Sequence, residues 1–338
     1  MEKNLLAAVI AILSVASCRQ VKENDFPDLA GPYLGQKLPG MIPEVFAPGI
    51  VCTGLYTRDI AIYKDGTEIY FCISDPAATA ILVTKLIDNR WTEPVIAPFS
   101  GKGFLDFEPH ITPDGTKFFF LSNRPPPGKE AKPGWLYQKI WMMNRTETGW
   151  SEPQMVEGPI SSENNEFFPS VTNEQVLYFT RSAKNGIPLI YRSVYKNSSY
   201  EKPEKLPFAI PETGMLFNAF ISPKEDFLIT CAQGIDSTNI DQDYYVTFRS
   251  PDGKWSKLVK FGPDINTPGD NANSAFVSPD GKFLFFSSSR KDPALPEIKS
   301  GTSLRDIIKT KSTPGNGSSA IYWVDAKTIQ ELRVKELK

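Results

Sequence analysis

A turn followed by an apolar strand recurs along this 338-residue chain, and it constrains the fold more than any other feature. An Asp-Gly turn precedes an apolar run at residues 64–71, 113–120 and 279–286, and the turn residues Asp65 and Asp114 lie 49 positions apart. Weaker copies occupy residues 172–179 and 222–229. A period of this length indicates a repeated supersecondary unit that buries its faces against its neighbours. The sequence therefore predicts five copies of one small unit.

A second marker, an aromatic residue at a hairpin tip, follows the first four copies in step. Each unit is interpreted as four strands, named a to d, with the Asp-Gly turn between a and b, where Gly supplies the positive φ of a tight hairpin. Strand b is apolar on both faces, as expected of a strand packed between two sheets. Sheets arranged radially around an axis provide this environment. The recurrence favours hairpin packing over an aromatic binding platform for the four tip residues, which are Trp91, Trp150, Tyr200 and Trp255.

The two ends of the repeat region are expected to join. The fifth unit has a strand c at residues 320–324 and then a short helix at 327–337 in place of an outer strand. Near the start, residues 42–48 resemble residues 93–98, which form strand d of the first unit. An N-terminal strand that completes the last blade would remove open edges that invite aggregation. We predict an all-β, five-bladed β-propeller over residues 41–338. A sixth blade, the alternative, would have to come from the short, proline-rich stretch 19–58.

Two segments carry a resemblance to a known family. Residues 107–115 (FEPHITPDG) and 274–281 (SAFVSPDG) resemble the WD40-like (PD40) repeats of the TolB-type propeller family, and the resemblance covers about residues 41–325. It implies the propeller fold and little about function, because one architecture hosts many activities. TolB itself has six blades and a separate N-terminal domain, which argues against a role in the Tol system. Prolyl-oligopeptidase relatives add an α/β-hydrolase domain, and no Gly-x-Ser-x-Gly is present here, so peptidase activity is not expected.

The N-terminus is typical of an exported lipoprotein. The apolar run at residues 5–16 is too short to span a bilayer and suits a signal-peptide core. It ends at residues 15–18 (VASC), which resemble a lipobox, so residues 1–17 are expected to be a signal peptide and Cys18 a lipid anchor. Residues 18–40 are then a tether. Arg19 in place of Asp points to the outer membrane, with the leaflet left open. An ordinary signal peptide with a chance Cys is the alternative.

Charge and cysteine content limit the partners. The 37 basic and 39 acidic residues give a net charge of −2, which disfavours nucleic acid as a partner. Cys52, Cys72 and Cys231 are expected to be buried free thiols, and a bridge between the first two is left open. His110 is the only histidine, so we predict a strand-packing role and no metal site. No cofactor is expected, although calcium on axial Asp and Asn oxygens is left open.

The long b-to-c and d-to-a connections lie on one face of such a ring, and polar residues gather there. Long loops on a rigid scaffold are where binding usually resides. The long b-to-c segments are residues 125–135, 232–243 and 291–319. Converging carboxylates, amides and guanidinium groups suit a glycan or another polar ligand, and the alternative is that they pair across blades. The candidates are Arg58, Asp59, Asp106, Glu108, Glu166, Asn218, Asn271 and Asn273 at the start of strand a, and Arg124, Arg181 and Arg290 after strand b.

Three functions follow from this pattern. The first is a non-catalytic cell-envelope lipoprotein that binds a glycan or a protein partner. The second in rank is a scaffold for other envelope proteins, dependent on residues 291–319. The third is a glycosidase-like enzyme, because five-bladed propellers house glycosidases. It would use two of the axial carboxylates Asp59, Asp106, Glu108 and Glu166 at a separation of about 5 Å or about 6.5–9.5 Å.

Overall fold

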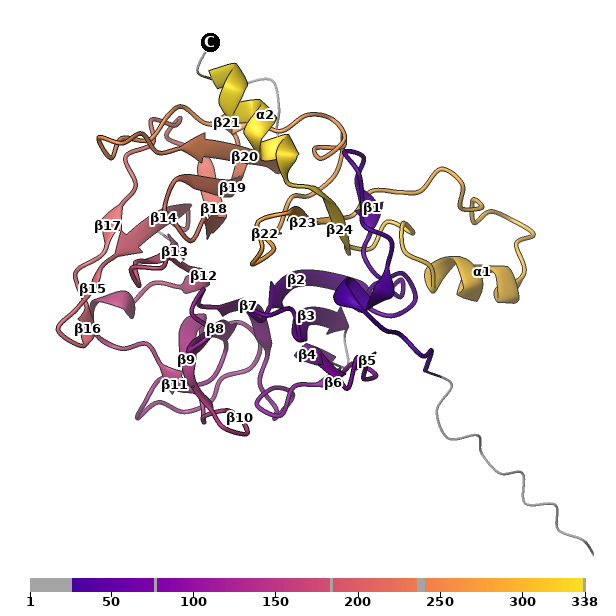
Figure 1. Cartoon of the computed structure of the whole chain (residues 1–338), viewed down its shortest axis with the longest axis horizontal. Helices are drawn as coiled ribbons and strands as arrows, with labels where there is room; N and C mark the ends of the chain where they lie inside the picture. The colour runs from indigo at the N-terminus through magenta and orange to yellow at the C-terminus, as the bar shows by residue number, and fades with distance from the viewer. Residues whose placement is uncertain (1–25, 76–77, 183–184, 236–240, 337–338) are drawn as a thin grey trace, which may run out of the picture.

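Five antiparallel sheets stand around a common axis and form a five-bladed β-propeller (Figure 1). The computed structural model describes residues 26–75, 78–182, 185–235 and 241–336. The expected signal peptide and Cys18 lie outside the described residues. The fold is the one that the repeat predicts, with five blades.

The blades follow one another in chain order, each with strand a nearest the axis. Blade 1 contains β2 (Tyr56–Ile62), β3 (Glu68–Asp75), β4 (Ala78–Ile87), β5 (Arg90–Trp91) and β6 (Val95–Ile96). Blade 2 contains β7 (Asp106–Ile111), β8 (Lys117–Ser122), β9 (Lys139–Thr146), β10 (Gly149–Trp150) and β11 (Gln154–Met155). Blade 3 contains β12 (Glu166–Val171), β13 (Leu177–Ser182), β14 (Pro188–Ser193) and β17 (Glu204–Lys205), with β15 (Tyr195–Lys196) and β16 (Ser199–Tyr200) at its hairpin tip.

Blade 4 contains β18 (Met215–Ile221), β19 (Phe227–Gln233), β20 (Asp243–Phe248) and β21 (Val259–Lys260). Blade 5 contains β22 (Ala275–Val277), β23 (Phe283–Ser288), β24 (Ala320–Asp325) and, from the start of the chain, β1 (Glu44–Val45). Two helices accompany this blade, α1 (Leu304–Lys311) in its β23–β24 loop and α2 (Lys327–Glu336) after β24. Short 3-10 turns occur at η1 (Pro32–Gly35) and η2 (Gly158–Ile160). No helix in the described part of the chain is long and apolar enough to cross a membrane.

The N-terminal strand closes the ring, as the sequence predicts. Glu44 of β1 lies opposite Trp323 of β24 in an antiparallel pair, and the Phe46 N–H donates to the Ile321 carbonyl at 2.8 Å. The ring of Phe46 is fully buried and packs against Trp323 and Phe285, with centroids 5.2 Å apart in both pairs. The last blade therefore depends on residues from both ends of the chain.

The core lies between neighbouring blades, because strand b is buried on both faces. In β8, Phe118 and Phe120 pack toward blade 1, where Phe118 meets Tyr70 with ring centroids 4.9 Å apart. Phe119 points the other way and joins the cluster that contains Phe179 of blade 3. Successive strand residues point to opposite faces, so a continuous run of phenylalanines fills two interfaces at once. Each such side chain stabilises the fold by about 1.5–3 kcal/mol.

The three predicted thiols are buried and free. Cys52 lies beside the ring closure, where the Ile321 N–H approaches its Sγ at 3.2 Å. Burial raises the pKa of the Cys52 thiol to about 12. Cys72 and Cys231 also have raised thiol pKa values because of burial. The bridge between Cys52 and Cys72 that the sequence left open is not formed.

Candidate functional site

A bulge with left-handed backbone recurs in strand a of four blades. The φ angles are +51° at Asp59, +59° at Glu108, +51° at Phe168 and +53° at Asn218, and the register between strands a and b shifts at each of these positions. Bulges re-aim a side chain, and positive φ is costly for residues other than glycine. Each of the four residues stands six positions before the turn residue of its own repeat. That spacing is the sequence signal that finds them, since their residue types differ.

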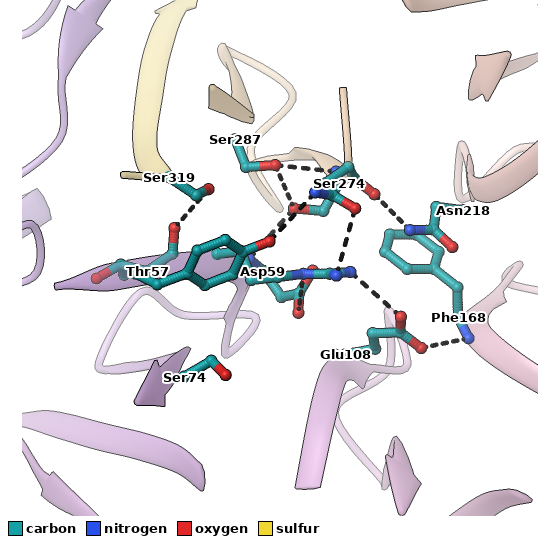
Figure 2. Close-up of polar contacts among 12 residues, drawn as sticks. Thr57, Asp59, Ser74, Glu108, Phe168, Asn218, Ser274, Ser287 and Ser319 are labelled. Carbon is teal, nitrogen blue, oxygen red and sulfur yellow. Dashed lines mark hydrogen bonds and ion pairs between the residues drawn. The ribbon is translucent and has the colours of Figure 1, made fainter. Parts of the chain in front are cut away.

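The bulges turn these side chains toward one another at the axis. Figure 2 shows Asp59, Glu108, Phe168, Asn218 and Ser274, one from each blade, around a shared centre. Ser274, which lies just before β22, also stands six positions before the turn residue of its repeat. Sequence reasoning selected Asp59, Glu108 and Asn218, and it missed Phe168 and Ser274 because neither residue type suggested a binding role.

The guanidinium of Arg58 is the hub of this axial cluster. Its Nε lies 2.9 Å and 3.0 Å from the two carboxylate oxygens of Asp59. Its Nη2 lies 3.2 Å from Glu108 Oε1, and its Nη1 lies 3.4 Å from Asn273 Oδ1. The side chain is only 11% exposed, and its guanidinium carbon lies 5.3 Å from the centre of the Phe107 ring. One cation from blade 1 thus holds groups from blades 1, 2 and 5.

The same residues also bond the backbone of neighbouring blades. Glu108 Oε2 accepts from the Phe168 N–H at 2.7 Å, and Ser274 Oγ accepts from the Asp59 N–H at 3.2 Å. The amide of Asn218 donates to the Asn273 carbonyl at 2.5 Å. Because buried backbone groups need partners, the first two bonds satisfy N–H groups of the bulges, the third satisfies a carbonyl, and all three link neighbouring blades at the axis.

Burial dominates the electrostatics of the cluster. It raises the pKa of Glu108 to about 8, and the negative charge of Asp59 adds to the rise, while Arg58 and the Phe168 N–H oppose it. Burial also lowers the pKa of His110 to about 4. The Nε2 of His110 accepts from the Val171 N–H at 2.9 Å, so this histidine is a neutral packing residue near pH 7. No group of three His, Cys, Asp or Glu side chains within the described ranges could hold a metal ion.

The remaining candidates form separate pairs in which an arginine after strand b meets a carboxylate at the start of strand a. In blade 2, Arg124 pairs with Asp106 and donates to the Phe99 carbonyl. In blade 3, Arg181 lies 3.0 Å from Glu166, which also lies 2.7 Å from Lys139.

In blade 5, Arg290 donates to the carbonyls of Asp264 and Ile265, both at 2.8 Å, and lies 4.0 Å from Asp270. Asp270 is the carboxylate partner of Arg290, as Asp106 is of Arg124 and Glu166 is of Arg181. The sequence analysis did not select Asp270. The backbone N–H of Asn271 donates to Asp270 Oδ1. The three arginines therefore do not contact the axial cluster around Arg58. Each donates to carbonyls of the loop that precedes strand a and so holds that loop against its blade.

The axis has little free space. The cavity between the blades, lined by Asp59, Glu108, His110, Phe168 and Phe220 among others, measures about 20 Å³, which is room for about one water molecule. A hollow of about 810 Å³ opens instead among the a-to-b turns of blades 3, 4 and 5 and against α2. We call the face that carries these turns the turn face, and the opposite one the long-loop face. A further hollow, of about 1030 Å³, lies beside Trp255.

The aromatic residues at the hairpin tips pack against neighbouring segments. The indole N–H of Trp150 donates to the Tyr70 hydroxyl at 2.8 Å, and that of Trp91 donates to the Gly31 carbonyl at 2.7 Å. Tyr200 is buried beside Tyr195. Trp255 is less covered and lies 6.4 Å from Phe208 between ring centres.

No family model matches the chain, and no curated protein matches it. Among solved structures, TolB from Acinetobacter baumannii is similar at 15% identity with a TM-score of 0.46, over 80% of this chain and 57% of that one. The putative TolB from Agrobacterium tumefaciens is similar at 12% identity with a TM-score of 0.44, over 86% of this chain and 99% of that one. A thermostable family-43 glycoside hydrolase is similar at 13% identity with a TM-score of 0.50, over 80% of this chain and 89% of that one. At 13% identity the likeness to the glycoside hydrolase extends to the fold alone.

Proposed function

We propose that this chain is a non-catalytic binding module of the bacterial cell envelope, attached through Cys18, and that it binds a protein partner at the turn-face hollow. The observation that carries the proposal is that the polar groups at the axis already hold one another. Arg58 bonds Asp59, Glu108 and Asn273 beside a cavity of about 20 Å³. Groups that are paired and buried in this way stabilise the ring, and this supports a binding site away from the axis.

The same pairing supports a non-catalytic role. Glycoside hydrolysis needs two carboxyl groups on either side of a space that holds a sugar. Asp59 and Glu108 share one arginine, and Asp106 and Glu166 are fully buried in their own ion pairs. The cavity that Asp59 and Glu108 line measures about 20 Å³, room for about one water, which favours a structural role for this pair over a sugar site.

The walls of the turn-face hollow favour a protein as the partner. The hollow is lined by the turns at Pro223 and Pro279, by the apolar side chains Leu38 and Phe227, and by Lys224. Charged residues line it as well: Lys282 lies 3.3 Å from Asp280, and Asp226 lies 2.9 Å from Arg333. A surface that combines apolar side chains with charged pairs is typical of a protein–protein interface.

Site-specific photo-cross-linking in cells tests this proposal. A photo-reactive amino acid is placed at Lys224, in the hollow, and as a matched control at Lys102, an exposed lysine in the β6–β7 loop. We expect one discrete cross-linked protein from position 224 and none from position 102. The proposal is overturned if neither position cross-links and an oligosaccharide raises the Tm of the wild type but not of Arg58→Lys, because the axis would then be the ligand site.

A further inference from the structure

The β23–β24 loop of blade 5, residues 291–319, forms a projecting lobe that carries α1 (Figure 1). We call it the α1 lobe. Helix α1 begins after Ser303, whose Oγ accepts from the Asp306 N–H at 3.2 Å and donates to the Asp306 carboxylate at 2.7 Å. This cap fixes the start of the helix. The carboxylate of Asp306 in the first turn accepts a hydrogen bond from the Ser303 hydroxyl.

Large aliphatic side chains of the lobe point into solvent. Leu304 is 71% exposed and Ile308 is 57% exposed. They lie four residues apart and therefore share one face of the helix. Ile298, earlier in the lobe, is also exposed. Leu304 and Ile308 thus form an exposed apolar ridge along α1.

The lobe is basic although the chain is slightly acidic. It holds five basic residues against three acidic ones, whereas the whole chain has a net charge of −2. Arg305 and Lys309 are four residues apart beside the ridge, an arrangement of like charges that weakens an isolated helix. No carboxylate in the described ranges forms an ion pair with Arg305, Lys309 or Lys311. An anionic surface would supply the missing counter-charge.

The C-terminal end of α1 is fixed to the ring. The Asn316 amide donates to the Lys311 carbonyl at 2.7 Å and to the Gly54 carbonyl at 2.9 Å. Gly54, just before blade 1, lies against the same turn, where a Cβ would stand 2.7 Å from the Ser312 carbonyl carbon. The ridge is therefore held in one orientation and needs no folding step before it meets a surface.

We propose that the ridge of α1 lies on an anionic lipid bilayer. Leu304 and Ile308 enter the boundary between headgroups and acyl chains, and Arg305, Lys309 and Lys311 meet the lipid phosphates. This is the arrangement of an interfacial amphipathic helix. A convex apolar ridge flanked by basic side chains fits an anionic bilayer better than it fits a neutral glycan. The contact is a second one, additional to the expected lipid anchor, and it does not depend on the protein partner at the turn face.

Hydrogen exchange on the full chain bound to vesicles tests the contact, because it reports on α1 whatever else attaches the protein. The vesicles are phosphatidylcholine alone or with about 30 mol % phosphatidylglycerol. We expect exchange in residues 304–311 to slow about tenfold on anionic vesicles only. Replacing Arg305 and Lys309 by Gln should reduce this protection, since each basic residue near an anionic surface adds about fivefold to binding.

The matched variants are Leu304→Ser/Ile308→Ser in the ridge and Val334→Ser, an equally exposed aliphatic residue on α2. The ridge variant should lose the protection and the α2 variant should keep it, with exchange in lipid-free protein showing that α1 still forms. Equal exchange on both kinds of vesicle overturns the proposal. Protection by soluble polyglutamate but not by anionic vesicles also overturns it, and points to an acidic protein instead.

Discussion

At the scale of the residue, Arg58 shows how one side chain can hold a ring together. It is nearly buried and bonds two carboxyl groups and an amide from three blades. Removing one partner from a buried ion pair costs about 3–5 kcal/mol, because the other charge is left uncompensated. We expect Arg58→Met to lower the free energy of unfolding by about that amount in urea denaturation. Lys254→Met, which removes an exposed ion pair with Asp252, should change it by less than about 1 kcal/mol. Equal losses would contradict the assigned role.

Glu108 makes the contribution of the axial cluster to stability depend on pH. Burial raises its pKa in the folded protein to about 8, above its ordinary value of 4.5. The folded state therefore binds the proton more tightly than the unfolded state, so this stabilisation is complete below pH 4.5 and is lost as pH rises through about 8. We expect the contribution of Glu108 to the free energy of unfolding to fall over that window by an amount on the order of a few kcal/mol, whereas His110, whose pKa is lowered to about 4, contributes a rise below pH 6.5.

Two matched substitutions check this pH dependence. Glu108→Gln should remove the falling contribution from the pH profile of the free energy of unfolding between pH 5 and pH 8, because Gln does not titrate. Glu93→Gln, at an exposed position, should leave the profile unchanged. The same pH profile for the wild type and Glu108→Gln between pH 5 and pH 8 would contradict the raised pKa of Glu108.

At the scale of the element, the blades were predictable and their contacts were not. Turn spacing and apolar runs predicted the strands, because each blade repeats the same local pattern. The sequence placed Arg58, Glu108 and Asn273 on one face, but it could not say which of them bond one another, because the three residues come from three different blades. The arginines after strand b were recognised, but Arg181 and Arg290 bond carbonyls of irregular loops, and no residue pattern specifies where a carbonyl points.

The contact that holds α1 against the ring depends on one glycine, Gly54. Gly54 has a φ of +89°, and a Cβ at this position would press on the backbone of Ser312. Gly54→Ala should destabilise the protein by about 1–3 kcal/mol and speed hydrogen exchange in α1. Gly103→Ala is the matched control, because Gly103 has a φ of +82° and open space around its Cα. If exchange in α1 were equally slow in both variants, Gly54 would not position the lobe.

At the scale of the whole molecule, closure by β1 makes the ring one cooperative unit, and Phe46 is the residue that tests it. Its ring is fully buried between Trp323 and Phe285, so Phe46→Ala should cost about 3–5 kcal/mol. Because every blade packs on two neighbours, we expect loss of this contact to lower the midpoint of a single transition, with tryptophan fluorescence and far-UV circular dichroism coinciding. Ile42→Ala, at a residue that is 74% exposed, should be neutral. Separate transitions for the two probes would mean that blade 5 opens by itself and that the N-terminal strand seals one blade rather than the ring.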